Sequence, residues 1–223
     1  MQQQLIHYRR FPSVEYAITN QSQYKPSMHK KDKMEAFLQP CKYVNYNHPD
    51  IQALAKSLKS DETLSTINNC FIWVRDNIKH SIDYQMNPVT CIAYDVLKHG
   101  TGFCYAKSHL LAALLRVNGV PTGLCYQRLS LNDDGAPYCL HGLNAVFTEQ
   151  FGWIRIDARG NNEQVNALFD PPEEYLAFAT NDPEEAMLPE IWTEPLPVVT
   201  QVLESCNTYE EVIANIPDIL LLR

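Results

Sequence analysis

The sequence predicts an α+β domain, with helices in its first half and an antiparallel sheet in its second half. Apolar residues recur at helical spacing over residues 51–58 and 64–78, whereas short runs typical of strands follow residue 122. Between the halves, a broad apolar stripe over residues 104–117 is typical of a buried central helix. Because helices precede strands instead of alternating with them, the order favours an α+β fold.

The helical half contains turn and stop signals that divide it into elements. A turn at Asn47-His48-Pro49-Asp50 precedes the first helix, and the second runs from about Leu64 to Ile78. We expect a short extended piece over His80 to Tyr84, and then a short helix from Cys91 to Leu97 that ends at Gly100. The central helix opens after Gly102-Phe103.

The end of the central helix is marked by Gly119, at the position of a left-handed C-cap, and by Pro121, which prevents continuation. Three strands follow, over Thr122–Ser130, Leu140–Thr148 and Gly152–Ala158. In the acidic tail after residue 180, helices are expected near Pro197–Leu203 and Tyr209–Ile213.

The composition excludes several functional classes. The net charge of −8 argues against nucleic-acid binding, which needs a basic surface for phosphate contacts. No apolar run reaches the roughly 18 residues of a membrane span, and the first ten residues do not resemble a signal peptide. The seven cysteines show no framework spacing, so we expect free thiols and a cytoplasmic location.

One cysteine stands where a nucleophile could be activated. A helix N-terminus lowers the pKa of a thiol, and Cys104 is predicted in the first turn, behind a glycine that permits a tight turn. An imidazole would accept and return the proton, and a carboxylate would orient that imidazole. His141 and Asp157 share strand parity, and a hairpin centred on Glu149 would pair them side by side.

These motifs resemble the transglutaminase-like superfamily. The helix from Gly102-Phe103-Cys104 to Gly119-Val120-Pro121, His141 with Val146, and the strand Trp153–Asp157 are similar to its cysteine, histidine and aspartate motifs. The resemblance implies a papain-like, circularly permuted fold, in which the nucleophile helix packs on an antiparallel sheet. It also implies a catalytic triad of Cys104, His141 and Asp157, an acyl-enzyme intermediate and no cofactor.

The resemblance covers roughly residues 35–180 and predicts the domain organisation. We expect an N-terminal arm over residues 1–34, the catalytic domain over 35–180, and a C-terminal extension over 181–223 that packs on it. Active members of the superfamily are transglutaminases, peptidases, amidases and peptide N-glycanases. The expected substrate is therefore a peptide, a protein or a small amide, and neither the residue identities nor the resemblance indicates an oligomeric state.

The sequence departs from the superfamily at three places near the expected cleft. Gly123 stands where an arginine is often found, and Leu143 stands where an aromatic residue is common. After the aspartate, Ala158-Arg159-Gly160 replaces a frequent proline. These departures leave the triad intact and bear on the class of substrate.

Other roles for these residues compete with the catalytic one. A cysteine is usually core filling, and Trp153 and Tyr84 are better explained as packed aromatics, although Tyr84 could donate to an oxyanion. The backbone N–H of Cys104 is the more dependable oxyanion donor. A silent interaction module of the same fold is one alternative. A metal site is another, and it would use the residues Cys104, Cys139, His141 and His109, although the chain lacks closely paired ligands.

Overall fold

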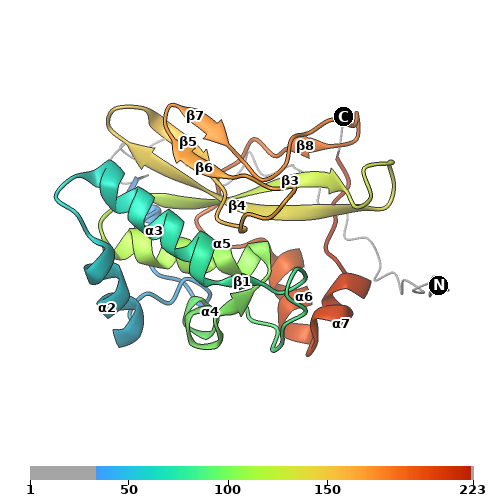
Figure 1. Ribbon diagram of the computed structural model, residues 1–223, viewed down its shortest axis with the longest axis horizontal. Helices are drawn as coiled ribbons and strands as arrows, with labels where there is room; N and C mark the ends of the chain where they lie inside the picture. The colour runs from blue at the N-terminus through green and yellow to red at the C-terminus, as the bar shows by residue number, and fades with distance from the viewer. Residues whose placement is uncertain (1–33, 222–223) are drawn as a thin grey trace.

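The computed structural model describes residues 34–221, so the N-terminal arm predicted over residues 1–34 lies almost entirely outside the described residues. Helices and an antiparallel sheet form two layers, which confirms the α+β prediction (Figure 1). The helices cover one face of the sheet. The opposite face is covered by a small hairpin and by the chain that follows it.

The helices begin and end close to the expected positions. They are α2 (Pro49–Leu58), α3 (Thr63–Asn77), α4 (Ala93–His99), α5 (Cys104–Val117), α6 (Pro197–Ser205) and α7 (Tyr209–Ala214). In α2, proline occupies the first turn and the His48 side chain accepts a hydrogen bond from the Asp50 N–H, so the predicted turn is also the cap. Gly119 has a φ of 79°, as a left-handed C-cap residue requires.

The main sheet has the strand order β5-β4-β3-β8, with every pair antiparallel. Its strands are β3 (Thr122–Ser130), β4 (Tyr138–Thr148), β5 (Gly152–Ile156) and β8 (Ala186–Met187). A separate parallel pair joins β1 (Lys79–His80) to β2 (Thr101–Gly102), and β6 (Leu168–Asp170) forms a hairpin with β7 (Glu173–Tyr175).

Strand alternation divides the sheet into two unequal faces. Even-numbered residues such as Leu124, Val146 and Ile154 join the main core against α5. Odd-numbered residues form a small cluster on the other face, where Leu143 and Ala145 pack with Trp153. The helix α5 is therefore the centre of the molecule, and nearly all of its residues are buried.

Residues 80–84 correct one prediction, because the extended piece stops at His80. Beyond it the backbone turns: the N–H of Tyr84 donates to the His80 carbonyl, and the N–H of Met86 donates to the Ser81 carbonyl. These local bonds replace a longer strand because β2, the pairing partner, is itself only two residues long.

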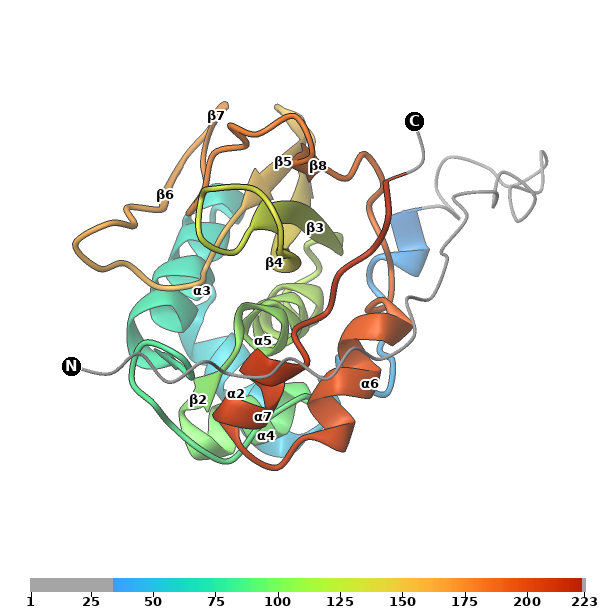
Figure 2. The ribbon, with the colours of Figure 1, turned by 90° about the vertical axis from the view of Figure 1, so that its right-hand side faces the viewer.

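The tail after residue 180 runs beside strand β3, continues into α6 and α7, and returns toward the sheet at its end (Figure 2). Trp192 forms a bridge with Leu124, and the carbonyl of Pro217 accepts a hydrogen bond from the Leu140 N–H at 2.7 Å. Arg128 binds both carboxylate oxygens of Asp218 at 2.8 and 2.9 Å. The tail is thus attached to both β3 and β4.

Candidate active site

Cys104 is the first residue of α5, as the sequence predicts, and its N-cap residue Phe103 has extended backbone. The amide groups of a first helical turn have no partner within the helix. Together with the helix dipole, they favour a thiolate at this position. Cys104 is 7% exposed, so the sulfur lies just beneath the surface.

Gly102 is needed for space, which corrects the expectation that it allows a tight turn. It lies in β2, and its φ is outside the left-handed region. A Cβ atom there would lie 3.1 Å from Thr90 Oγ1 and 3.2 Å from Ala106 Cβ. The missing side chain lets β2 pass close to the start of α5.

Gly142 brings the sheet to the nucleophile, and the sequence reasoning missed it. A Cβ atom at this position would lie 2.8 Å from Tyr105 Cδ1 and 3.1 Å from Tyr105 Cα. The close approach allows the Gly142 N–H to donate to Cys104 Sγ at 3.4 Å. An isolated glycine inside a strand pattern is the signal that could have indicated such an approach.

His141 and Asp157 lie together, but through a different register from the predicted one. The three-residue loop of the hairpin is centred on Gln150, not Glu149, because Thr148 pairs with Gly152. Gly152, with a φ of 73°, supplies the left-handed residue that such loops favour. Continued past β5, this register places Asp157 opposite Leu143, diagonal to His141. The diagonal spacing is still within reach, and His141 Nε2 lies 2.7 Å from Asp157 Oδ2.

The carboxylate of Asp157 is fully buried and surrounded by donors. Its Oδ1 accepts the Arg159 N–H at 3.1 Å, and its Oδ2 accepts the Ala177 N–H at 3.0 Å in addition to the bond with His141. Burial alone would raise the pKa of Asp157. The charge and the hydrogen bond of His141, together with the two amides, hold it below its usual range.

The charges favour a thiolate–imidazolium pair. Burial would raise the pKa of Cys104, but the imidazoles of His141 and His80 lower it to about 6. Burial would also disfavour a charged His141, yet Asp157 and the Cys104 sulfur raise its pKa to about 10. Between these values the sulfur is ionised and the ring is protonated, which is the form that attacks a carbonyl carbon and then protonates a leaving amine.

Four other buried cysteines provide an internal contrast. Burial raises their pKa to about 12, and none of them has an imidazole among the causes of the shift; they are Cys70, Cys91, Cys125 and Cys139. All seven cysteines are free thiols, as expected. The environment of Cys104 therefore differs from that of these four in its charge partners.

His80 is a second histidine beside the nucleophile that the sequence reasoning missed. It is 5% exposed and interacts with the Cys104 sulfur. On its other side, Nδ1 lies 3.5 Å from Asp83 Oδ1. No local pattern identified His80, because it reaches Cys104 through the pairing of β1 with β2, two segments about twenty residues apart.

Several residues considered from the sequence lie elsewhere. Tyr84 is 55% exposed, with Lys79 Nζ 4.5 Å from the centre of its ring. His109 is buried, with Nδ1 2.7 Å from the Cys91 carbonyl oxygen. Within residues 34–221, no group of three or more histidine, cysteine or acidic side chains is arranged to hold a metal ion.

Two departures from the superfamily pattern have structural explanations. A Cβ atom at Gly123 would lie 2.2 Å from Ile191 Cγ2 and 3.2 Å from the Trp192 carbonyl oxygen. The glycine therefore leaves space for the tail segment that runs beside β3. Arg159 donates to both oxygens of Asp83 at 2.8 Å. Leu143, the third departure, is fully buried in the small cluster.

The chain after β7 lies across the site. The ring of Phe178 meets the His141 ring edge-on, with centroids 5.0 Å apart, and the Arg159 guanidinium lies 5.4 Å from the same phenyl ring. The carbonyl of Phe178 accepts a hydrogen bond from Gln127 at 3.0 Å. This segment therefore restricts solvent access to the catalytic candidates.

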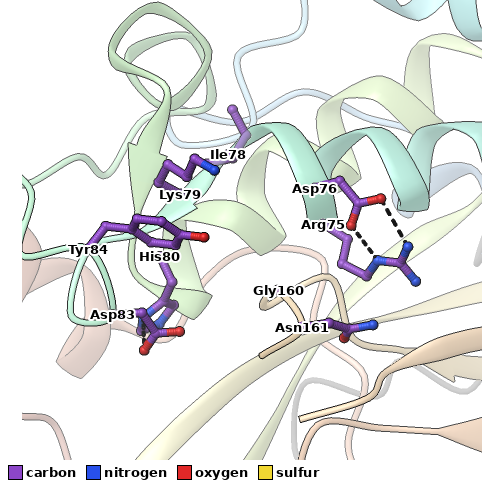
Figure 3. Close-up of a pocket in the computed structure, with 9 residues that line it drawn as sticks. All are labelled: Arg75, Asp76, Ile78, Lys79, His80, Asp83, Tyr84, Gly160 and Asn161. Atoms are coloured by element: carbon purple, nitrogen blue, oxygen red, sulfur yellow. Dashed lines mark hydrogen bonds and ion pairs between the residues drawn. The ribbon is translucent and has the colours of Figure 1, made fainter. Parts of the chain in front are cut away.

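A small cavity of about 140 Å³ lies beside the site (Figure 3). His80 and Asp83 face each other on one side of it, Arg75 and Asp76 pair on another, and Tyr84 and Asn161 also line it. Charges of both signs are present, and the carboxylates each have a cationic partner. Among the residues that line the cavity, His80 is the one that also lowers the pKa of Cys104.

Comparison with protein families places part of this architecture in a known group. Residues 52–158 match the family model of the transglutaminase-like superfamily core. This segment contains α3, α5 and all three triad candidates. A search of the curated proteins found no match.

Three solved structures are similar to part of this chain. A candidate cysteine protease from Cytophaga hutchinsonii is 21% identical, with a TM-score of 0.48, and the match covers 60% of this chain and 44% of that one. The periplasmic domain of TgpA from Pseudomonas aeruginosa is 20% identical, with a TM-score of 0.44 and coverages of 59% and 48%. A candidate protease from Parabacteroides distasonis is 14% identical, with a TM-score of 0.37 and coverages of 55% and 25%. The aligned part spans less than half of each of these structures.

Proposed function

We propose that this chain is an acyl-transfer enzyme acting on an amide or peptide bond, starting from the match of residues 52–158 to the transglutaminase-like superfamily. Cys104, His141 and Asp157 form the catalytic triad of the proposal. The product is released either by water, as in a peptidase or amidase, or by an amine, as in a transglutaminase. The substrate is a peptide, a protein or a small amide.

The observation that carries the proposal is the arrangement around Cys104, which begins α5 and lies beside a histidine that Asp157 holds at 2.7 Å. The neighbouring imidazoles lower the pKa of Cys104 to about 6, whereas burial raises the pKa of another buried thiol, Cys70, to about 12. A structural cysteine needs neither feature. A nucleophile needs both, because only the thiolate attacks and because the same ring must later supply a proton.

The reaction follows from this geometry in two halves. The Cys104 thiolate attacks the carbonyl carbon, and the negative charge moves to the carbonyl oxygen, near the backbone N–H of Cys104. His141 donates its proton to the leaving nitrogen as the C–N bond breaks, which leaves a thioester and a neutral imidazole. The imidazole then takes a proton from water or an amine, which attacks the thioester and releases the thiolate.

We also propose that the enzyme is cytoplasmic and works without a cofactor. The seven free thiols support a reducing compartment. Separately, among the described residues, no helix combines the length and the apolar character needed to cross a membrane.

An acyl-enzyme trapping screen tests the proposal. Small amides, glutamine peptides and activated esters would be incubated with the protein, with and without a primary amine, and adducts on Cys104 would be located by mass spectrometry. Products formed only with the amine indicate a transferase, and products formed without it indicate a hydrolase. Cys104→Ala is the negative control, and turnover retained in that variant would contradict the mechanism.

The competing function is a catalytically silent interaction module. Its one supporting observation is the covered site, in which Cys104 and His141 are 7% and 4% exposed. Reaction with iodoacetamide at neutral pH separates the two functions. Selective modification of Cys104 over the other six thiols is expected for the enzyme, whereas equal or absent labelling would favour the module.

A further inference from the structure

Two histidines, not one, are arranged around the Cys104 sulfur, and each is backed by a carboxylate. His141 has Asp157 behind it at 2.7 Å, and His80 has Asp83 behind it at 3.5 Å. We call these the first pair and the second pair. The triad uses the first pair only, and the second pair has no part in the proposed reaction as described above.

The backbone directs His80 toward the nucleophile. In the parallel pair of β1 and β2, His80 lies opposite Gly102, two residues before Cys104. The N–H of Ser81 donates to the Gly102 carbonyl at 3.1 Å, which attaches this strand to the loop that enters α5. The ring of Phe103 meets the His80 ring edge-on, with centroids 6.0 Å apart. His80 is therefore positioned by the segment that also positions the sulfur.

The second pair is stabilised from outside by Arg159. Its two terminal nitrogens bind the two oxygens of Asp83, each at 2.8 Å, in the bidentate geometry that favours a fixed carboxylate. Burial would raise the pKa of Asp83, but His80 and Arg159 hold it below the usual range, so the carboxylate stays charged. The N–H of the same arginine donates to Asp157, so Arg159 contacts the carboxylates of both pairs.

A buried histidine with a purely structural role looks different in this protein. His109 is also fully enclosed, but its ring bonds a backbone carbonyl, and burial lowers its pKa to about 4. It therefore stays neutral and has no carboxylate partner. His80 instead places one ring nitrogen toward the Asp83 carboxylate and interacts with the Cys104 sulfur, so its ring lies between a bound anion and the nucleophile.

From this arrangement we infer that His80 is a further catalytic residue, whose ring donates a hydrogen bond first to the Cys104 thiolate and then to the oxygen anion formed by its attack. The inference rests on the proposed acyl transfer. Nδ1 lies on the Asp83 side, 3.5 Å from Oδ1 and without a hydrogen bond to it, and the N–H of Nε2 is the donor in this inference. No proton is transferred by His80: it stabilises the anion, while His141 carries the proton to the leaving nitrogen. Asp83 and Arg159 are positioning residues that act through the ring.

The titratable and charged groups around His80 belong to several segments. Arg75 and Asp76, at the end of α3, line the same cavity as His80, as do the neighbouring Lys79 and Tyr84. Asp83 follows His80 in the turn, Arg159 lies in the loop after β5, and Cys104 and Lys107 belong to α5. Lys107 is buried and donates to the carbonyls of Arg75 and Ile78. Any pH dependence assigned to His80 must therefore be measured at Cys104 itself.

The test is the pH dependence of Cys104 alkylation by iodoacetamide, which requires no substrate. His80→Leu removes the donor, and we expect the alkylation midpoint to rise by about one pH unit. With a substrate found in the trapping screen, kcat should fall by about 10- to 100-fold with KM nearly unchanged. His80→Gln keeps a side-chain N–H and should recover much of kcat. His99→Gln, an exposed histidine on α4, should behave like the unmodified protein.

Arg159→Gln is a second variant for the case in which His80→Leu does not fold. It changes the side chain that binds Asp83 and leaves His80 in place. Its alkylation midpoint should move in the same direction by a smaller amount. If His80→Leu folds and its alkylation midpoint equals that of the unmodified protein, the inference is wrong. If His80→Leu does not fold, the inference is wrong when His80→Gln and Arg159→Gln both keep the midpoint of the unmodified protein. Failure of the proposed function is distinguishable, because Cys104 would then show no selective alkylation even in the unmodified protein.

Discussion

The two histidine–carboxylate pairs beside Cys104 differ in the kind of structure that holds them. The first pair stands on the main sheet: His141 is within β4, and Asp157 is fully buried and held by two backbone amides. The second pair stands on a two-residue strand and a turn, and the Asp83 side chain, held by another side chain, is 23% exposed. Because the first pair is held by the main sheet and by backbone amides, and the second by a turn and one side chain, we expect substitutions in the first pair to have the larger effect.

The largest effects on turnover are expected when the nucleophile or the base is removed. Cys104→Ala removes the nucleophile and His141→Ala removes the base, so each should lower kcat by about 10⁴-fold or more. The measurement is turnover of the substrate found in the trapping screen. Cys125→Ala, a buried cysteine in the small cluster, is the matched control and should keep most of the activity.

Asp157→Asn tests how much the first pair depends on its carboxylate. We expect a loss of about 10²- to 10⁴-fold in kcat, with measurable activity left, because the ring loses its orientation but not its chemistry. The pH profile of kcat/KM should rise near pH 6, as Cys104 ionises, and fall near pH 10, as His141 loses its proton. Because Asp157 raises the pKa of His141, the variant should lose activity at a lower pH on the alkaline side. An unchanged alkaline limb would contradict the assignment of Asp157.

Asp83→Asn makes the matching change in the second pair and should have a smaller effect, about 10-fold in kcat. The Asn side chain can still face His80, but the negative charge beside the ring and the ion pair with Arg159 are lost. The alkylation midpoint of Cys104 should rise slightly. A loss of kcat as large as that of Asp157→Asn would contradict the expectation that the first pair contributes more to the reaction than the second pair.

Gly142→Ala is expected to have the smallest effect on chemistry and a clear one on stability. The added methyl group meets Tyr105 at 2.8 Å, so β4 or α5 must shift, at a cost of about 1–3 kcal/mol in the free energy of unfolding. The shift also lengthens the contact between the Gly142 N–H and Cys104 Sγ, and so alkylation should slow. Gly152→Ala is the control: it strains a left-handed residue in the same hairpin, and should lower the melting temperature without slowing alkylation.

The hairpin of β4 and β5 shows what strand alternation predicts about the site and what it leaves open. Equal parity placed His141 and Asp157 on one face, and the structure brings them within 2.7 Å. The register itself depends on where the chain can turn, and the left-handed Gly152 moves the centre of the loop by one residue. The parity argument tolerated this error, because a diagonal neighbour is still within reach of a carboxylate.

The sequence by itself determined the elements and the three triad candidates. Helical periodicity, a terminal glycine and proline, and strand alternation are local patterns, so the range 104–117 and the strand from Thr122 to Ser130 could be read directly. Only the tertiary structure decided which other groups surround the triad candidates. His80 reaches the sulfur through strand pairing, and the Gly142 N–H reaches it through close packing. Arg159 binds Asp83, a partner 76 residues away. The charge state of Cys104 was likewise decided there, because burial and neighbouring imidazoles act through space and leave no local pattern in the chain.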